Sequence, residues 1–452
     1  MTGYGTTATA GLRNRWTDIF RADTAIHLAV MGSITIGTLQ GFLKDRFGGP
    51  VPYVGADALL IFAAFFWFAD LAIRKRRISD PGGFATRVFV LIAVPILYLM
   101  LPGTPFGIQL AGLRAWTMFP VSCLVALTII RTPGQVRAYV GLILILGLIT
   151  GVYGILQYRA GPQVAIDVAP LANVRHGGTV FYVAGGQAEF RAFSTFTFPA
   201  PFAGFMVFAL ILATALVVSR HRPRGQRWMA ALLIPVLFVG MTVSGTRAAL
   251  ITLLGGLALI GLYRGFGLRE LLVLPLLLIA LHLGSLLTSG SIMSRYATLY
   301  AKEAELWTYV YAPMLTAVRA IGQAPFGLGL GRTGVGVPAA LGAGMPPGYF
   351  VFSDGDIGRA AAEMGLIGLA LLALLVFGLL PFAHRATKRL LKSVDEDLAL
   401  GLGPLVLATG VLVLIGSPLS SAPHGTIWYF LFGALVKLAM LRTGKEPSAI
   451  AK

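Results

Sequence analysis

Residues 361–380 read AAEMGLIGLALLALLVFGLL, an apolar run with a single charged side chain, Glu363. A run of about 20 such residues is long enough to cross the roughly 30 Å hydrocarbon layer of a bilayer as a helix. Comparable runs recur along the 452-residue chain, for example at 54–71. Their recurrence predicts a polytopic helical membrane protein.

The overall composition favours the same class. Hydrophobic residues make up 56% of the chain and charged residues only 12%, and the mean hydropathy is +0.80. Soluble domains carry about 25% charged residues, so these values exclude a water-soluble globular enzyme, a disordered chain and a coiled coil. The one cysteine, Cys123, allows no intrachain disulfide. The first 23 residues are polar and basic, and no secretory signal is evident in them.

The apolar runs predict an all-α membrane bundle of about twelve spans with a large outer loop between spans 9 and 10. We place the spans at 24–41, 53–73, 84–101, 114–130, 138–158, 196–218, 228–245, 247–263, 269–287, 359–383, 398–417 and 425–441. The predicted organisation is a cytoplasmic N-terminus (1–23), nine spans (24–287) that include an outer loop at 159–195, a large extracytoplasmic loop (288–358), three last spans (359–441) and a cytoplasmic C-terminus (442–452).

The distribution of Lys and Arg predicts the orientation of the bundle. Every even-numbered loop of this topology is basic, as in the run RKRR at 74–77, and basic loops stay on the cytoplasmic side of a membrane. Both termini are therefore expected in the cytoplasm. The net charge of +18 then indicates a bias between the membrane faces and anionic ligands, and no nucleic-acid partner is expected.

Twelve of the 36 Lys and Arg residues fall on the outer side, where the topology rule disfavours them. The ordinary explanation is contact with lipid headgroups, which we expect for Arg46, Arg114 and Arg159. The alternative is an anion site, because guanidinium groups bind phosphate oxygens as a fork. A diphosphate would need two or three such forks, and the candidates are Arg191, Arg247, Arg319, Arg332 and Arg359. For Arg247, capping of the preceding helix is an equal alternative.

Acidic residues around the start of the tenth predicted span are the candidates for acid–base chemistry. Asp354 and Asp356 precede the span, so each could cap the helix, act as a general base beside Arg359, or do both. Glu363 lies one turn inside the apolar helix, where a carboxylate is costly unless it has a partner. We expect Glu363 to have a structural role, through an ion pair or a hydrogen bond to a loop.

Other kinds of site have little support in the sequence. It shows no metal-ligand spacing and no serine elbow, and the basic loops hold no phosphate-binding glycine motif. We therefore expect no metal, no cofactor and no cytoplasmic nucleotide site. The histidines of the outer half are isolated in sequence, which favours packing roles over catalysis: His176, His282 and His424.

Short motifs follow one another on the predicted topology. They are LQY at 156–158, FRAFSTF at 190–196, SGTRAAL at 244–250, APFGLGLG at 324–331 after Trp307, and EMGLIG at 363–368. In this order they resemble segments of the O-antigen ligase and O-antigen polymerase superfamily of bacterial envelope glycosyltransferases. The resemblance covers most of the chain and is strongest at about 185–370.

The resemblance implies glycan transfer from an undecaprenyl-diphosphate-linked saccharide to an acceptor saccharide hydroxyl at the outer face of the bacterial inner membrane. Ligases of this family usually place a His-Asn pair nine residues before the glutamate, where this chain has Asp354 and Gly355. An Asp can fill the same role, so we favour polymerisation of a surface polysaccharide over ligation to lipid A core. Polysaccharide export machinery is a candidate partner. The alternatives are a polyprenyl-linked sugar flippase and a non-catalytic scaffold.

In the expected mechanism, Arg191, Arg247 and Arg319 hold the departing diphosphate, and Asp354 or Asp356 takes the proton of the acceptor hydroxyl. Direct displacement would invert the anomeric centre. These side chains are expected to converge on one cavity that is open both to lipid and to the outside.

Overall fold

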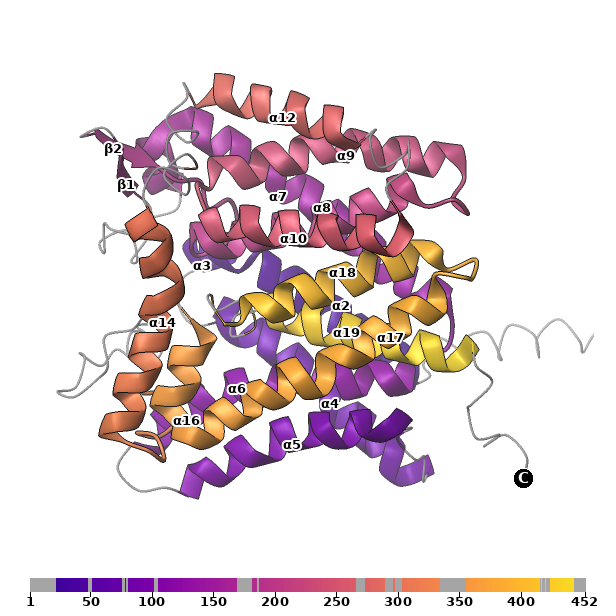
Figure 1. Cartoon of the computed structure of the whole chain (residues 1–452), viewed down its shortest axis with the longest axis vertical. Coiled ribbons are helices and arrows are strands. Elements are labelled where there is room, and N and C mark those ends of the chain that lie inside the picture. The colour runs from indigo at the N-terminus through magenta and orange to yellow at the C-terminus, as the bar shows by residue number, and fades with distance from the viewer. Residues whose placement is uncertain are drawn as a thin grey trace, which may run out of the picture.

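The computed structural model describes residues 22–47, 51–74, 78, 80–100, 105–168, 181–184, 187–265, 273–288, 296, 303–333, 355–414, 416, 419 and 423–442. Within these ranges the protein is a bundle of long helices that run side by side (Figure 1). Helices satisfy their own backbone hydrogen bonds, which a chain this apolar requires in a lipid environment. The coarse fold expected from the sequence, a helical membrane bundle, is confirmed.

The helices, in chain order, are α2 (Ala22–Thr38), α3 (Gln40–Phe47), α4 (Val51–Arg74), α5 (Phe84–Leu97), α6 (Phe106–Ile129), α7 (Pro133–Val168), α8 (Pro199–Val218), α9 (Arg224–Val243), α10 (Arg247–Arg264), α12 (Val273–Leu287), α14 (Glu303–Gln323), α16 (Asp356–Ala373), α17 (Leu380–Leu390), α18 (Glu396–Leu412) and α19 (His424–Arg442). Two 3-10 turns flank α5, η1 (Pro81–Gly83) and η2 (Tyr98–Met100), and the π-helical turn η4 (Leu374–Leu379) joins α16 to α17.

Every predicted span overlaps a helix, but the count of twelve is not confirmed. In the described part of the chain, nine helices are long and apolar enough to cross a membrane. Helices α2 and α18 have 17 residues each and α12 has 15, fewer than the about 20 that a full crossing needs. Helix α7 also continues past the predicted end at 158 to Val168, with a break at Gly161 (φ +86°).

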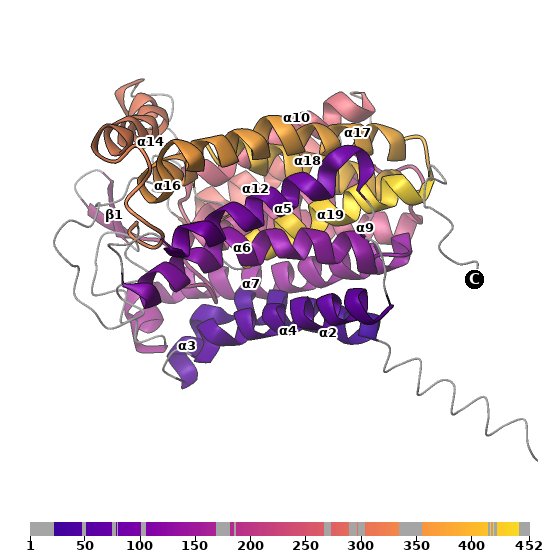
Figure 2. The same ribbon diagram turned by 90° about the horizontal axis from the view of Figure 1, so that it is seen from below.

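A β-hairpin and a helix occur inside the predicted outer loops. Strands β1 (Phe181–Ala184) and β2 (Gln187–Phe190) form a two-stranded antiparallel hairpin in the first loop. Helix α14 lies in the second loop and crosses the end of the bundle (Figures 1 and 2). Its amphipathic pattern, interrupted by Pro313, does not resemble an apolar span, so the sequence predicts no membrane helix there.

Helices α8 and α19 form the centre of the bundle. Almost all of the α19 span is buried, and most of the α8 span is buried as well. Small residues bring α19 against α6: a Cβ atom on Gly433 would lie 2.3 Å from the Cys123 carbonyl oxygen. Close approach through glycine favours packing between membrane helices, because the hydrophobic effect does not drive helices together in lipid.

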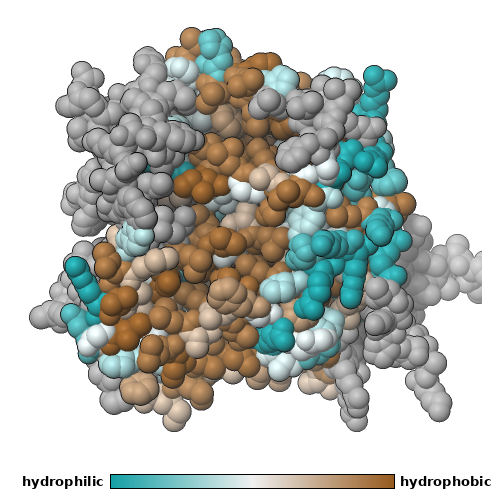
Figure 3. All heavy atoms as spheres, viewed as in Figure 1, coloured by the Kyte–Doolittle hydropathy of each residue, from teal (hydrophilic) through white to brown (hydrophobic). Residues whose placement is uncertain are grey.

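Ion pairs gather at the end of the bundle opposite α14. Asp395 and Asp397, at the start of α18, are buried and pair with arginines from three other segments. The Nη2 atom of Arg137 donates to the Asp395 carboxylate (2.8 Å), and the Nε atoms of Arg222 and Arg442 donate to Asp397 and Asp395 (3.0 Å each). Hydrophilic side chains are concentrated at this end (Figure 3). Basic residues from three of the segments that the sequence assigns to the cytoplasm therefore come together at one end.

Candidate functional site

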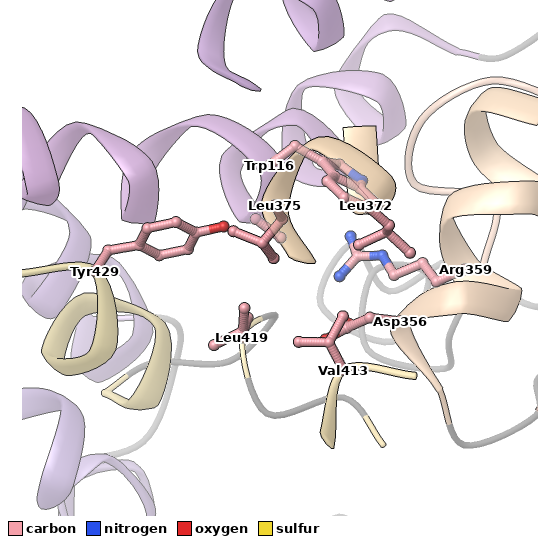
Figure 4. A pocket seen from close by; sticks show the side chains of 9 residues that line it. Trp116, Asp356, Arg359, Leu372, Leu375, Val413, Leu419 and Tyr429 are labelled. Atoms are coloured by element: carbon pink, nitrogen blue, oxygen red, sulfur yellow. The ribbon is translucent and has the colours of Figure 1, made fainter. Parts of the chain in front are cut away.

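A small cavity of about 30 Å³ lies where α6, α16 and α19 meet, toward the end of the bundle that carries α14 (Figure 4). Two of its lining side chains are charged, Asp356 and Arg359, while the rest are mainly apolar or aromatic. The lining residues are Ala115, Trp116, Asp356, Arg359, Leu372, Leu375, Val413, Leu419 and Tyr429.

Arg359 is held in a fixed position at the edge of this cavity. Its Nε atom donates to the Glu363 carboxylate (3.2 Å), and its guanidinium carbon lies 5.4 Å from the centre of the Trp116 ring. The second contact is a cation–π interaction. Figure 4 shows the terminal nitrogens pointing into the cavity, between Trp116 and Asp356. The side chain is therefore oriented before any ligand binds.

Asp356 is the first residue of α16 and is only 4% exposed. Its backbone N–H donates to the Gly416 carbonyl oxygen (3.0 Å), in the segment that follows α18. Gly355 occupies the N-cap position, without a capping side chain, so Asp356 is not the N-cap residue of α16, one of the alternatives that we considered for it. A carboxylate in the first turn is favoured by the helix dipole, and this one lines the cavity beside Arg359.

Glu363 is fully buried and organises the wall of the cavity. Its carboxylate accepts hydrogen bonds from Thr333 Oγ1 (2.6 Å), Trp116 Nε1 (2.6 Å) and Arg359 Nε (3.2 Å). A buried charge is tolerated only when it is paired and hydrogen-bonded, and this group is both. Its partners are a loop hydroxyl and a cation, the kinds of partner that we expected for a carboxylate at this position.

The glycine-rich segment at 324–333 packs directly on α16. The backbone N–H of Gly329 donates to the Glu363 carbonyl oxygen (3.1 Å). Gly365 has φ +61°, and a Cβ atom there would lie 2.0 Å from the Pro325 carbonyl oxygen. Only glycine fits at such a position. The motifs at 324–331 and 363–368 are therefore in direct contact. This contact holds the Thr333 hydroxyl against the Glu363 carboxylate.

Arg191 and Arg247 lie at a different place, the turn between α9 and α10. Arg191 Nε donates to the Ser244 carbonyl oxygen (2.9 Å), and Arg191 Nη2 donates to Thr246 Oγ1 (3.0 Å). Ser244 is the C-cap residue of α9, so Arg191 makes the carbonyl contact that we had considered for Arg247. Arg247 is the first residue of α10, and neither arginine lines the cavity.

The other candidate residues are dispersed. Arg319 is exposed on α14, and Arg332 is half-buried in the glycine-rich segment. Asp354 lies outside the described residues. Of the five arginines expected to bind a diphosphate, only Arg359 lines this cavity. The expected convergence of Arg191, Arg247 and Arg319 is not found there, because Arg191 closes a turn and Arg319 projects from an exposed helix face.

Several site contacts were not anticipated from the sequence. Trp116 and Tyr429 line the cavity. The only hint in the sequence was that both residues place a polar group, the indole N–H or the phenol O–H, inside an apolar helix. Such a group needs a hydrogen-bond partner. Arg114, which we expected at lipid headgroups, pairs instead with Asp57 of α4 (2.5 Å). His424 is buried among phenylalanines, 5.5 Å from Phe208 between ring centres, in line with a packing role.

A second, smaller pocket shares part of the cavity wall. It has a volume of about 20 Å³, and its additional lining residues are Leu91 of α5, Pro120 of α6 and Leu371 of α16. Trp116, Leu372, Leu375 and Tyr429 line both spaces. The cavity beside Asp356 and Arg359 thus adjoins a small apolar space between α5, α6 and α16.

Comparisons with known proteins assign no family. No protein-family model matches the chain, and no curated protein matches it. Among the described residues, no group of three or more His, Cys, Asp or Glu side chains could hold a metal ion.

Proposed function

We propose that this protein transfers a glycan from a polyprenyl-diphosphate-linked saccharide to an acceptor sugar hydroxyl, at the outer face of the bacterial inner membrane. One observation carries the proposal: a cavity in a membrane bundle combines a buried carboxylate, Asp356, with an oriented guanidinium, Arg359. The diphosphate needs a cation, the acceptor hydroxyl needs a base, and the lipid tail needs apolar space. The apolar side chains between α5, α6 and α16 are where we propose that this tail lies against the bundle.

Arg359 and Asp356 have different roles in the proposed reaction. Arg359 binds the diphosphate and stabilises the negative charge that grows on it as the bond to the anomeric carbon breaks. Asp356 takes the proton from the acceptor hydroxyl as its oxygen attacks that carbon. One displacement inverts the anomeric centre. Glu363 and Trp116 position Arg359, and Arg332 is a second candidate cation because it precedes Thr333, which donates to Glu363.

Arg359 gives the direct test of this proposal. Arg359→Ala should lower the rate of transfer from a purified lipid-linked donor by roughly 10²–10³-fold, the usual cost of removing one group that stabilises transition-state charge. Arg359→Lys should retain part of the rate, because it keeps the charge but loses the fork. Arg46→Ala is the control, since Arg46 is exposed on α3 and does not line the cavity. Full activity in Arg359→Ala would refute the proposal.

Within this reaction class, we favour a polymerase over a ligase. The basis is the sequence, which has Asp354 where ligases usually have His. A gel of lipid-linked glycans from a deletion strain separates the two: loss of a polymerase leaves single repeat units, whereas loss of a ligase leaves long unattached chains. The polymerase proposal makes the export machinery for the polysaccharide a partner.

A flippase for lipid-linked sugars is the second candidate. It is favoured by the interruptions of α16, which has non-helical geometry at Gly365 and passes into the π-helical turn η4. Discontinuous helices that line a cavity are common in transporters. Movement of lipid-linked sugar across liposomes without new glycosidic bonds would favour this function over glycan transfer.

A further inference from the structure

Helix α14 is oriented across the other helices. The bundle helices run along one direction, and α14 lies roughly perpendicular to them at their end (Figure 1); it is seen nearly end-on after a 90° turn (Figure 2). If the bundle helices span a bilayer, α14 lies in the plane of one interface. This is the interface opposite the basic loops, which the charge distribution assigns to the outside.

The two faces of α14 have different neighbours. Ala317 and Ala320 are buried against Ala361 and Ala362 of α16, and small residues allow the two helices to approach closely. The opposite face is apolar but exposed: Tyr311 is 43%, Leu315 52% and Val318 67% exposed. These positions are spaced by four and three residues, so they form one stripe along the helix.

The exposed stripe is continuous with the lipid-facing surface of the bundle. Figure 3 shows hydrophobic side chains over the lower part of α14 that merge with the hydrophobic belt over the neighbouring helices. Phe326, just beyond the helix, is 71% exposed as well. Apolar patches of this kind are rare on water-facing surfaces. Arg319, next to Val318, places a cation beside the stripe.

We propose that α14 is an interfacial helix seated in the outer leaflet, with the stripe Tyr311, Leu315 and Val318 among the acyl chains and Arg319 at the phospholipid phosphates. Amphipathic helices with this division of faces lie in the plane of the interface. The proposal explains why Arg319 does not line the cavity. It is independent of glycan transfer, because it concerns only where α14 lies relative to lipid.

The position of α14 has a consequence for the start of α16. A Cβ atom on Gly355 would lie 2.9 Å from Cβ of Pro313, so α14 abuts the residue before Asp356. With α14 held at the interface, the start of α16 is kept at a fixed depth; only on the proposed function is this the depth where a lipid diphosphate meets a water-borne acceptor.

A fluorescent label on α14 tests this proposal in the full chain. Cys123 is completely buried, so a cysteine introduced as Val318→Cys can be labelled selectively with an environment-sensitive dye. Gln323→Cys is the matched control, because Gln323 is exposed on the same helix but away from the stripe. Both proteins are reconstituted in vesicles of phosphatidylethanolamine and phosphatidylglycerol. Quenching is measured with nitroxide-labelled lipid and with aqueous iodide.

We expect nitroxide lipid to quench the Val318 label at least about twofold more than the Gln323 label, and iodide to show the reverse order. Quenching of the Val318 label by iodide, as strong as in the control, would place the stripe in water and overturn the proposal. Protection from both quenchers would show that protein covers the stripe, which overturns it equally.

Discussion

Replacement of Asp356 by Asn is expected to lower glycan transfer about 10²–10⁴-fold, the usual contribution of a general base, and to leave the bundle folded. Asn has nearly the same shape as Asp but cannot take a proton from the acceptor hydroxyl. The backbone hydrogen bond from residue 356 to Gly416 does not involve the side chain and is retained. The measurement is the initial rate of transfer by the purified protein in lipid nanodiscs.

Asp57→Asn is the matched control for this substitution. Asp57 lies on α4 and pairs with Arg114, and neither side chain lines the cavity, so its loss should leave the rate of transfer close to that of the unmodified protein. An unchanged rate in Asp356→Asn would remove Asp356 as the base. If Asp354→Asn were then inactive, the role would pass to Asp354, the other candidate from the sequence.

The sequence predicted the bundle well because span formation depends on local composition. A run such as 361–380 is too apolar for a water-exposed segment. It forms a helix because unpaired backbone N–H and C=O groups are costly in lipid. The same reasoning failed for α14, whose pattern is amphipathic and whose place depends on packing against α16. The count of twelve spans stays a prediction, since nine helices of the described residues are long and apolar enough to cross a membrane and α12 has 15 described residues.

The site was less predictable, because side-chain partners are set by tertiary structure. The sequence indicated that Glu363 needs a partner, but Trp116 is 247 positions away along the chain. Arg191 was grouped with Arg359 because both are arginines on the outer side. Its actual partner is the Ser244 carbonyl oxygen, a contact that leaves no trace in the local sequence. Residue types therefore predicted that the site contains carboxylates and guanidinium groups. They did not predict which of these side chains are in contact with one another.

Replacement of Glu363 by Ala is expected to lower the free energy of unfolding by about 3–5 kcal/mol, the usual cost of breaking a buried ion pair by removing one partner. The change leaves Arg359 without its carboxylate, and the donors of Trp116 and Thr333 lose their acceptor. The measurement is denaturant unfolding in detergent, followed by tryptophan fluorescence. Glu363→Gln should lose less, because its amide oxygen can still accept one of these hydrogen bonds.

The matched control is Asp23→Ala, which breaks the ion pair between Asp23 and Arg131. There the Arg131 side chain is 46% exposed, so water replaces the lost partner and the expected cost is only about 0–1 kcal/mol. Equal losses of unfolding free energy in Asp23→Ala and Glu363→Ala would mean that the Glu363 carboxylate does not stabilise the site through its buried contacts. A larger loss in Glu363→Ala, with transfer reduced even where the protein remains folded, would show that the carboxylate both stabilises the wall and orients Arg359. Stability and chemistry would then depend on the same buried group.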